Sequence, residues 1–262
     1  MDIRINNPGK AEIFAALFQH IKLFTEHVNI MFSQDKMFIQ AMDSSRVSIF
    51  EIHLPATWFD VYTNSRESGI TIGINANLLF KVLNAREKNQ LLHIKFDEDN
   101  EDKLYLDFTS ESNTVFDKNF EIPLIDMDFE VMSIPTIDYQ AEFSIPSVNF
   151  AILINQLQMF GDTLQIECSE DKIQLCSTSI ETGKMSVEIP IDDLTSFAIL
   201  EGQQLNLSFS LSHLHNICLY SKLSKDVEIN LSADYPIKMV YSLGQMEAKF
   251  VFYLAPKIGD NE

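Results

Sequence analysis

The residues best suited to metal binding or proton transfer form two pairs, and neither pair has a complete set of partners. His213 and His215 are two positions apart, which points their imidazoles to different sides of a helix, and no Cys or Asp stands at ligand spacing around them. Asp126 and Asp128 could pair for acid–base chemistry, but no His or Lys stands near them in the sequence. Neither pair therefore indicates a catalytic or metal site.

The acidic run at 97–102 has the composition of a calcium-binding loop but not its pattern. Its sixth position is Asp102, where an EF-hand loop needs Gly, and its twelfth is Phe108, where the loop needs Glu. A solvated hairpin tip is the expected structure. The chain also contains no Gly-rich phosphate-binding motif, no H-E-x-x-H and no G-x-S-x-G. We therefore expect no enzymatic activity, no metal and no cofactor.

Charge and cysteine content narrow the class of protein further. The 38 acidic and 19 basic residues give a net charge of −19, which by itself argues against a nucleic-acid ligand, because phosphate binding relies mainly on Lys and Arg. Cys168, Cys176 and Cys218 are an odd number without C-x-x-C spacing, as expected of buried thiols in a reducing compartment. The N-terminus lacks a signal-peptide pattern and no apolar run reaches about 18 residues, so we expect a soluble intracellular protein.

The elements that must position these side chains occur twice along the chain. Residues 14–18 align with 150–154 at an offset of 136 residues (150 − 14). The same offset carries 33–36 onto 169–172. With 262 residues, of which 46% are hydrophobic, the chain is long enough for two cores. Two similar domains in tandem are the simplest interpretation.

Each repeat is predicted to begin with an amphipathic helix. Apolar residues recur at helical spacing over 14–24 and again over 150–160, and a second helix is expected around 78–83 and 211–218. Short alternating or β-branched runs predict strands at 28–32, 37–40, 47–54, 70–74, 91–96, 104–108, 164–168, 173–176, 185–189, 205–209, 227–231, 237–241 and 249–253. Because strands outnumber helices, we predict an α+β fold in which each half forms an antiparallel sheet with two helices on one face.

Residues 124–140 are predicted to connect two domains at 1–123 and 141–262. The segment has neither helical nor strand periodicity and carries many large apolar side chains, whereas flexible linkers are Gly/Ser-rich or polar. We therefore expect it to lie against the body of the protein. Two alternatives stay open: a partly exposed docking surface for another chain, or a segment that fills a groove between the domains.

Four strings of residues carry a resemblance to a known family. M-D-S-S-R-V at 42–47, the linker from L-I-D-M-D at 124–128 to I-P at 134–135, S-A-D-Y-P at 232–236 and Y-L-A-P-K-I at 253–258 occur in that order on the duplicated scaffold. Together they resemble the proliferating cell nuclear antigen family of eukaryotic DNA sliding clamps, over the whole chain. The resemblance implies the DNA clamp fold, with three subunits forming a ring of six similar domains whose helices line the central hole.

This resemblance implies a sliding clamp and DNA polymerase processivity factor that serves replication and repair. Such a clamp encircles double-stranded DNA without sequence preference and tethers DNA polymerase, the clamp loader and other proteins with a glutamine-and-aromatic motif. The net charge allows this, because screening beyond about 8 Å at physiological salt lets a basic inner wall coexist with an acidic exterior. A ring holds its duplex by topology, so weak phosphate contacts suffice. The implied location is the nucleus, or a cytoplasmic replication site if the chain is viral.

Cations on or beside the helices are the implied DNA-facing residues, with three histidines as auxiliaries. They are Lys10, Lys22, Lys81, Arg86, Lys88, Lys222 and Lys225, with His20, His213 and His215. The sequence departs from the family at the helix expected over 147–160, which contains no Lys or Arg, whereas typical clamps carry arginines at the positions of Ile152 and Asn155. We therefore expect lower direct affinity for a duplex. Glu170 replaces the lysine that is modified in many members, which argues against that regulation.

The matched motifs also imply a pocket for partner peptides. Its apolar residues are Met42, Val47, Met132, Ile134, Pro236 and Tyr253, while Ala255 and Pro256 match the position where the incoming glutamine is held. A core position is a credible alternative for Val47. Met side chains and an apolar linker make an adaptable surface that can accept many peptides.

Subunits are expected to pair an edge strand at 115–122 of one copy with 184–189 of the next. The implied interface residues are Phe120, Ile122, Leu83, Leu157, Phe160, Met185 and Val187. Pro123 removes a backbone donor near the end of this strand, which favours one alternative, a clamp-fold factor that works as a monomer or dimer. The uncharged helix favours a second alternative, a peptide-binding scaffold that no longer encircles DNA.

Overall fold

The computed structural model describes residues 1–262 except 98–99, 111–114, 129, 245–246 and 258–262. The chain divides into two compact units, which are described one at a time. Unit 1 comprises residues 1–44, 50–132 and 243–249, and unit 2 comprises residues 45–49, 133–242 and 250–262. The main division, after residue 132, falls inside the segment predicted as the linker. The linker bounds themselves, 124–140, stay a prediction.

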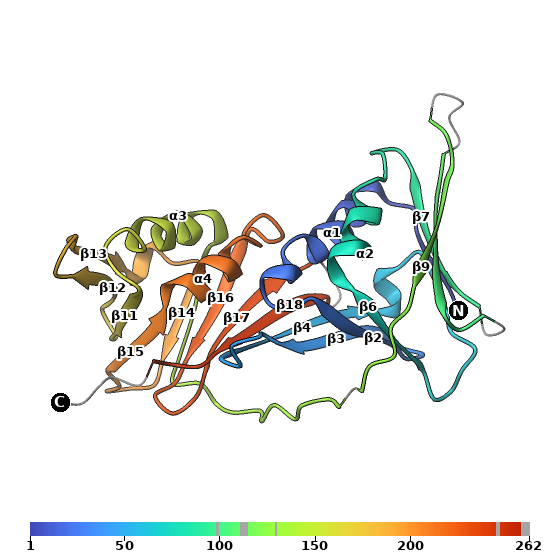
Figure 1. Ribbon diagram of the computed structural model, residues 1–262. Coiled ribbons are helices and arrows are strands. Elements are labelled where there is room, and N and C mark those ends of the chain that lie inside the picture. Colours follow the sequence, from blue (N-terminus) through green and yellow to red (C-terminus); the bar gives the residue numbers. More distant parts are fainter. Residues whose placement is uncertain (98–99, 111–114, 129, 245–246, 258–262) are drawn as a thin grey trace. The chain divides into compact units, whose positions relative to one another are not determined.

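Unit 1 contains two sheets and a pair of α-helices among its described residues (Figure 1). The first sheet has the order β5-β1-β7-β8-β9 and is antiparallel throughout. The second has the order β4-β3-β2-β6. The strands are β1 (Asp2–Ile5), β2 (His27–Phe32), β3 (Lys36–Met42), β4 (Ser48–Pro55), β5 (Val61–Thr63), β6 (Ile70–Asn75), β7 (Leu91–Phe96), β8 (Lys103–Thr109) and β9 (Lys118–Pro123). The helices are α1 (Pro8–Gln19) and α2 (Ala76–Leu83), with 3₁₀ turns at Ile21–Leu23 and Ala56–Trp58.

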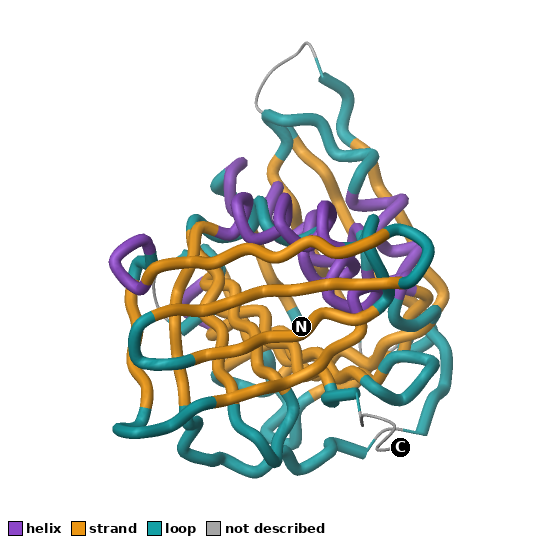
Figure 2. Tube along the Cα trace, turned by 90° about the vertical axis from the view of Figure 1, so that its left-hand side faces the viewer, coloured by secondary structure: helices purple, strands orange, loops and turns teal. Residues whose placement is uncertain are grey.

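Unit 2 repeats this arrangement. One group of strands has the order β14-β10-β16-β17-β18. The strands of the other sheet, β13-β12-β11-β15, run side by side across the front of Figure 2. The strands are β10 (Ala141–Pro146), β11 (Thr163–Cys168), β12 (Lys172–Ser179), β13 (Gly183–Pro190), β14 (Ser196–Ile199), β15 (Leu205–Ser210), β16 (Asp226–Leu231), β17 (Ile237–Ser242) and β18 (Lys249–Leu254). The helices are α3 (Ser147–Leu157) and α4 (Leu211–Cys218), with a 3₁₀ turn at Ile191–Asp193.

Local sequence explains where these elements form. In β8 every second residue is buried, as expected of a strand with one face on the core. Helices α1 and α2 each begin at an Asn side chain that caps the first turn: Asn7 Oδ1 accepts from the Lys10 N–H (3.1 Å) and Asn75 Oδ1 accepts from the Leu78 N–H (2.9 Å). The two helices of each unit lie side by side (Figure 1), and their apolar faces complete the core.

The predicted repeat, the four helices and the α+β class are confirmed. Both units follow one order, with a helix after the first and after the sixth of their nine strands. Helix α1 ends earlier than expected, at Gln19, because the apolar spacing continues through the 3₁₀ turn, where Ile21 and Phe24 are still buried. The acidic run predicted as a hairpin tip connects β7 to β8, and its residues 98–99 lie outside the described residues.

One detail differs from the expectation. Strands β1, β5, β10 and β14 were not predicted. Strands β1, β5 and β14 have four residues or fewer, too few to show alternation. Strand β10 does alternate, with Ala141, Phe143 and Ile145 buried, and its pattern was missed.

Candidate functional site

The linker after β9 is attached to unit 1 where it begins. The Leu124 N–H donates to the Asp102 carbonyl (2.8 Å), and the Ile125 N–H donates to the Gly73 carbonyl of β6 (2.9 Å). Gly73 is needed there, because a side chain at this position would collide with the Ile125 carbonyl. The described part of 126–139 contains neither helix nor strand (Figure 1).

A second attachment is made by Gln40 on β3, whose residue is only 3% exposed. Its Oε1 accepts from the Met132 N–H (2.7 Å), and its Nε2 donates to the Met132 carbonyl (3.0 Å) and to Glu51 Oε1 (2.9 Å). Glu51 Oε2 lies 3.0 Å from His53 Nε2. Burial alone would raise the pKa of Glu51, but hydrogen bonds from His53 and Gln40 and the charge of Lys249 leave this pKa below its ordinary value. These two attachments hold residues 124, 125 and 132 of the predicted linker against unit 1.

All eight residues predicted for the peptide pocket are at least partly exposed. Met42 and Met132 belong to unit 1, and Val47, Ile134, Pro236, Tyr253, Ala255 and Pro256 belong to unit 2. Within unit 2 the Ala255 N–H donates to the Val47 carbonyl (2.9 Å), so the structure brings these two residues together. Val47 is 38% exposed, which excludes the core position considered for it. Assembly of the whole set into one pocket stays a prediction.

The loop that carries Val47 has an unusual backbone and a polar contact to a helix. Arg46 has a φ of 61°, a left-handed conformation that non-glycine residues adopt rarely. Ser45 Oγ lies 3.1 Å from His213 Nε2, and His213 Nδ1 lies 2.9 Å from Ser210 Oγ. His213, expected only as an auxiliary DNA contact, therefore connects helix α4 to this loop.

The seven predicted DNA-facing cations differ in their exposure. Five are exposed, namely Lys22, Lys81, Lys88, Lys222 and Lys225. Lys10 Nζ instead donates to the Trp58 carbonyl (2.6 Å) and lies 5.7 Å from the centre of the indole ring. Arg86 Nη1 donates to three backbone carbonyls between Glu87 and Gln90, at 3.1, 3.2 and 2.8 Å. Lys10 and Arg86 thus bind backbone carbonyls within unit 1. The spacing of residues in the sequence could not indicate these contacts.

Helix α3 has a neutral surface. It contains no Lys or Arg, and its exposed side chains include Val148 (52% exposed) and Ile152 (49%). Asn155 Oδ1 lies 2.6 Å from His215 Nδ1 of α4, so the auxiliary His215 contacts a position at which the resemblance implies an arginine. In unit 1, burial and the charge of Lys22 lower the pKa of His20, which keeps this imidazole neutral at neutral pH.

Strands β9 and β13 each lie at the edge of a sheet, as expected for strands that pair between subunits. Strand β9 begins at Lys118, three residues later than predicted, and Pro123 is its last residue. Phe120, Phe160, Met185 and Val187 are partly exposed. Leu83, Ile122 and Leu157 are instead buried within the single chain, because they fill the core behind the surface. The side chains of these three can support an interface from beneath, while the backbone of Ile122 lies on edge strand β9.

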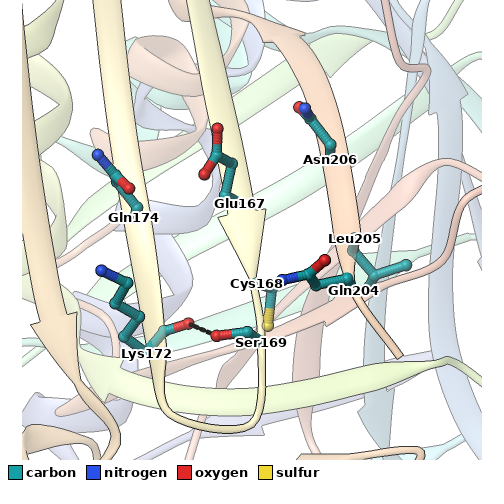
Figure 3. Close-up of a pocket in the computed structure, with 8 residues that line it drawn as sticks. All are labelled: Glu167, Cys168, Ser169, Lys172, Gln174, Gln204, Leu205 and Asn206. Carbon is teal, nitrogen blue, oxygen red and sulfur yellow. Dashed lines mark hydrogen bonds between the residues drawn. The ribbon is translucent and has the colours of Figure 1, made fainter. Parts of the chain in front are cut away.

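A cavity of about 320 Å³ lies beside the β11–β12 turn of unit 2 (Figure 3). It is lined by Glu167, Cys168, Ser169, Lys172, Gln174, Gln204, Leu205 and Asn206. Lys172 Nζ pairs with Glu188 (2.6 Å), and burial raises the pKa of Cys168 to about 11, so the thiol stays protonated at neutral pH. The cavity therefore offers no activated nucleophile.

Three further observations concern the described part of the chain. Its residues include no group of three or more His, Cys, Asp or Glu side chains that could hold a metal ion. No helix in it is long and apolar enough to cross a membrane. Glu170, which the resemblance placed at a modified lysine position, accepts a hydrogen bond from the Gly202 N–H (2.8 Å).

Two tandem α+β units with the same order of strands and paired helices define a protein of the DNA clamp class. Comparison with known proteins agrees. Residues 4–131 match the N-terminal domain of proliferating cell nuclear antigen, and residues 133–257 match its C-terminal domain. The chain is 34% identical over 260 residues to the proliferating cell nuclear antigen of Chaetomium thermophilum, covering 97% of each chain. The chain belongs to the proliferating cell nuclear antigen family.

Family membership supports the predicted function of the chain, a sliding clamp and DNA polymerase processivity factor in replication and repair. It does not favour the two alternatives, a monomeric or dimeric factor and a scaffold without DNA encirclement. The clamps of this family act without catalysis and bind DNA and polymerase as trimers. A viral source finds no support in these matches.

Proposed function

We propose that three copies of this chain join head to tail into a ring that encircles duplex DNA and tethers partner proteins through the predicted peptide pocket. The observation that carries this proposal is that both units present an edge strand, β9 in unit 1 and β13 in unit 2. Pairing β9 of one copy with β13 of the next is a heterologous contact, and such contacts form closed rings when the rotation permits.

The acidic side chains on the two edges are already neutralised, which favours this pairing. Glu121 on β9 pairs with Lys103 of the neighbouring strand (2.7 Å), and Glu188 on β13 pairs with Lys172 (2.6 Å). Like charges brought opposite each other would destabilise a sheet. Partly exposed apolar residues on the same strands, Phe120 and Val187 among them, would then be buried by the contact.

The five exposed lysines support sequence-independent contact with the phosphates of a duplex inside the ring. Each copy would contribute Lys22, Lys81, Lys88, Lys222 and Lys225. Because α3 is neutral, we propose that the duplex is held mainly by topology and only weakly by charge. Such weak contacts favour sliding along the DNA.

Partner proteins are proposed to bind through a short peptide with one glutamine, one aliphatic and two aromatic anchors. The exposed Val47 beside Ala255 and the partly exposed Met132 support this assignment. DNA polymerase and the clamp loader are the proposed partners, and the nucleus is the proposed location. We assign no catalytic step, metal or cofactor to the chain.

The assembly is tested by the mass in solution. Light scattering on the full chain at micromolar concentration should give three times 30.0 kDa. Substituting Val187→Lys on β13 should reduce this mass to that of the single chain, because a charge would be buried at the contact. The exposed Lys222→Gln variant, outside both edges, should leave the mass unchanged. A wild-type mass of 30.0 kDa would reject the ring.

A further inference from the structure

We propose that Gln40 is a positioning residue of the partner site, because its side chain holds the linker at Met132 and so sets the affinity of the site for peptides. This inference rests on the proposed function of that site. Gln40 and Met132 are 92 residues apart in the chain and both belong to unit 1.

The contact has two points, which fixes the linker more strictly than apolar packing would. A primary amide offers an acceptor and a donor on neighbouring atoms, and Gln40 uses both on the backbone of one residue, at 2.7 Å and 3.0 Å. A neighbouring strand would bind that residue in the same way. Gln40 thus acts as a one-residue substitute for strand pairing.

Fixing one residue also fixes which linker side chains point toward the partner. Residues two apart in an extended segment point to the same side, so Met132 and Ile134 form one set and Val131 and Ser133 form the other. A slip by one residue would exchange the two sets. Val131 is already 46% exposed, whereas Met132 is half-buried, which agrees with a linker held in a single register.

Gln40 is itself held from behind. Its Nε2 also donates to Glu51 Oε1 (2.9 Å), and Glu51 is bound by His53 (3.0 Å). The His53 ring also packs against the ring of Phe38 in a tilted arrangement, with 4.9 Å between the ring centres. A chain of hydrogen bonds therefore runs from His53 through Glu51 and Gln40 to the Met132 backbone. A polar network is rigid when its groups are satisfied in this way.

The experiment compares two buried glutamines of unit 1 that both bind backbone groups. Gln90, 1% exposed, accepts from the Glu87 N–H (2.9 Å) and donates to the Phe116 carbonyl (2.8 Å), outside the linker. Gln40→Ala should weaken binding of a synthetic glutamine-and-aromatic peptide by about tenfold and remove the hydrogen-exchange protection of the Met132 amide. Gln90→Ala should lower stability while leaving both readouts unchanged.

An exchange of the side chains at positions 40 and 51 tests the hydrogen bonds separately from stability. Gln40→Glu alone should weaken binding of the peptide as much as Gln40→Ala does, because the new carboxylate faces the carboxylate of Glu51. Adding Glu51→Gln should recover part of the affinity, since the new amide at position 51 can donate to the carboxylate at position 40, which still accepts from Met132. No recovery in a folded double variant would count against the proposed contact.

The outcomes separate this inference from the proposed function. Wild-type protein that binds no such peptide would refute the partner site. Wild-type protein that binds the peptide, with Gln40→Ala binding equally well, would overturn the role of Gln40. If Gln40→Ala does not fold, hydrogen exchange in the wild-type chain tests the contact instead. The Met132 amide should exchange more slowly than the amides of Val131 and Ser133. Equal exchange rates would refute the contact.

Discussion

Met132 and Ile134 are the residues whose side chains test the partner site most simply. Replacing both with Ala should weaken binding of the glutamine-and-aromatic peptide by about 1 kcal/mol or more, because truncating anchors at the centre of an interface removes buried contacts. Titration calorimetry with wild-type and double-variant protein measures the difference. Val131→Ala on the same linker is the matched control and should change the affinity little. Unchanged affinity in the double variant would remove both residues from the site.

Lys22 and Lys81 test the DNA-facing assignment. Replacing both with Glu should impair loading onto DNA and polymerase stimulation, since each exposed cation lost removes a phosphate contact and each new carboxylate repels the backbone. The mass in solution should stay unchanged. Lys36→Glu, an exposed residue at the start of β3 that belongs to no helix, is the control. Equal loss of activity in the control would point to net charge instead of position.

The lowered pKa of Glu51 predicts how the stability of unit 1 depends on pH. This pKa is lower in the folded chain than the ordinary value of 4.5, so the charged carboxylate stabilises the folded state. This stabilisation is complete above 4.5 and is lost as the pH falls through the folded-state pKa. Urea unfolding should therefore show a larger difference between wild type and Glu51→Gln at neutral pH than in acid. A difference that does not change with pH would contradict the assigned contacts.

Individual side chains were the least predictable part of the site. Motif matching selected Val47 and Met132, whose exposure agrees with a binding surface. It could not show that Lys10 binds Trp58 or that Arg86 binds its own loop, because helix spacing says which face a residue occupies and not what lies beside it. The contact between Gln40 and Met132 was missed for the same reason.

Helix α3 contains no Lys or Arg where the resemblance implies arginines, and its role can be tested by adding charge. Ile152→Arg places a cation on a side chain that is 49% exposed. Affinity for a short duplex should rise, and the plot of log affinity against log salt should steepen by about one unit per added phosphate contact. Ile152→Gln, which is polar but neutral, should leave the slope unchanged. The same slope in both variants would show that α3 does not face the duplex.

Regular elements were predicted well where their apolar pattern is long. Helices α1 and α3 followed from apolar spacing over about three turns, and β8 followed from strict alternation of buried residues. Strands β1 and β14, with four residues each, offered too little pattern. The division of each half into two sheets depends on pairing between distant strands such as β1 and β7, which no local pattern specifies.

For the complete chain, the duplicated order of strands and helices was visible in the sequence. A single offset of 136 residues aligns two separate segments of the first half with two segments of the second. The net charge of −19 was misleading, because charge counted over the chain ignores where the cations lie. Five exposed lysines on or beside the helices are compatible with an acidic protein that holds DNA weakly. Encirclement, and not affinity, is therefore the property to measure.

Retention on circular DNA measures encirclement directly. The chain is loaded onto nicked circular DNA with a cognate clamp loader, separated from free protein, and assayed before and after the circle is cut once. A ring held by topology should stay on the circle at a salt concentration that breaks phosphate contacts, and should leave when the DNA becomes linear. Equal retention on circular and linear DNA, or loss from both at the same salt concentration, would contradict a clamp that encircles its duplex.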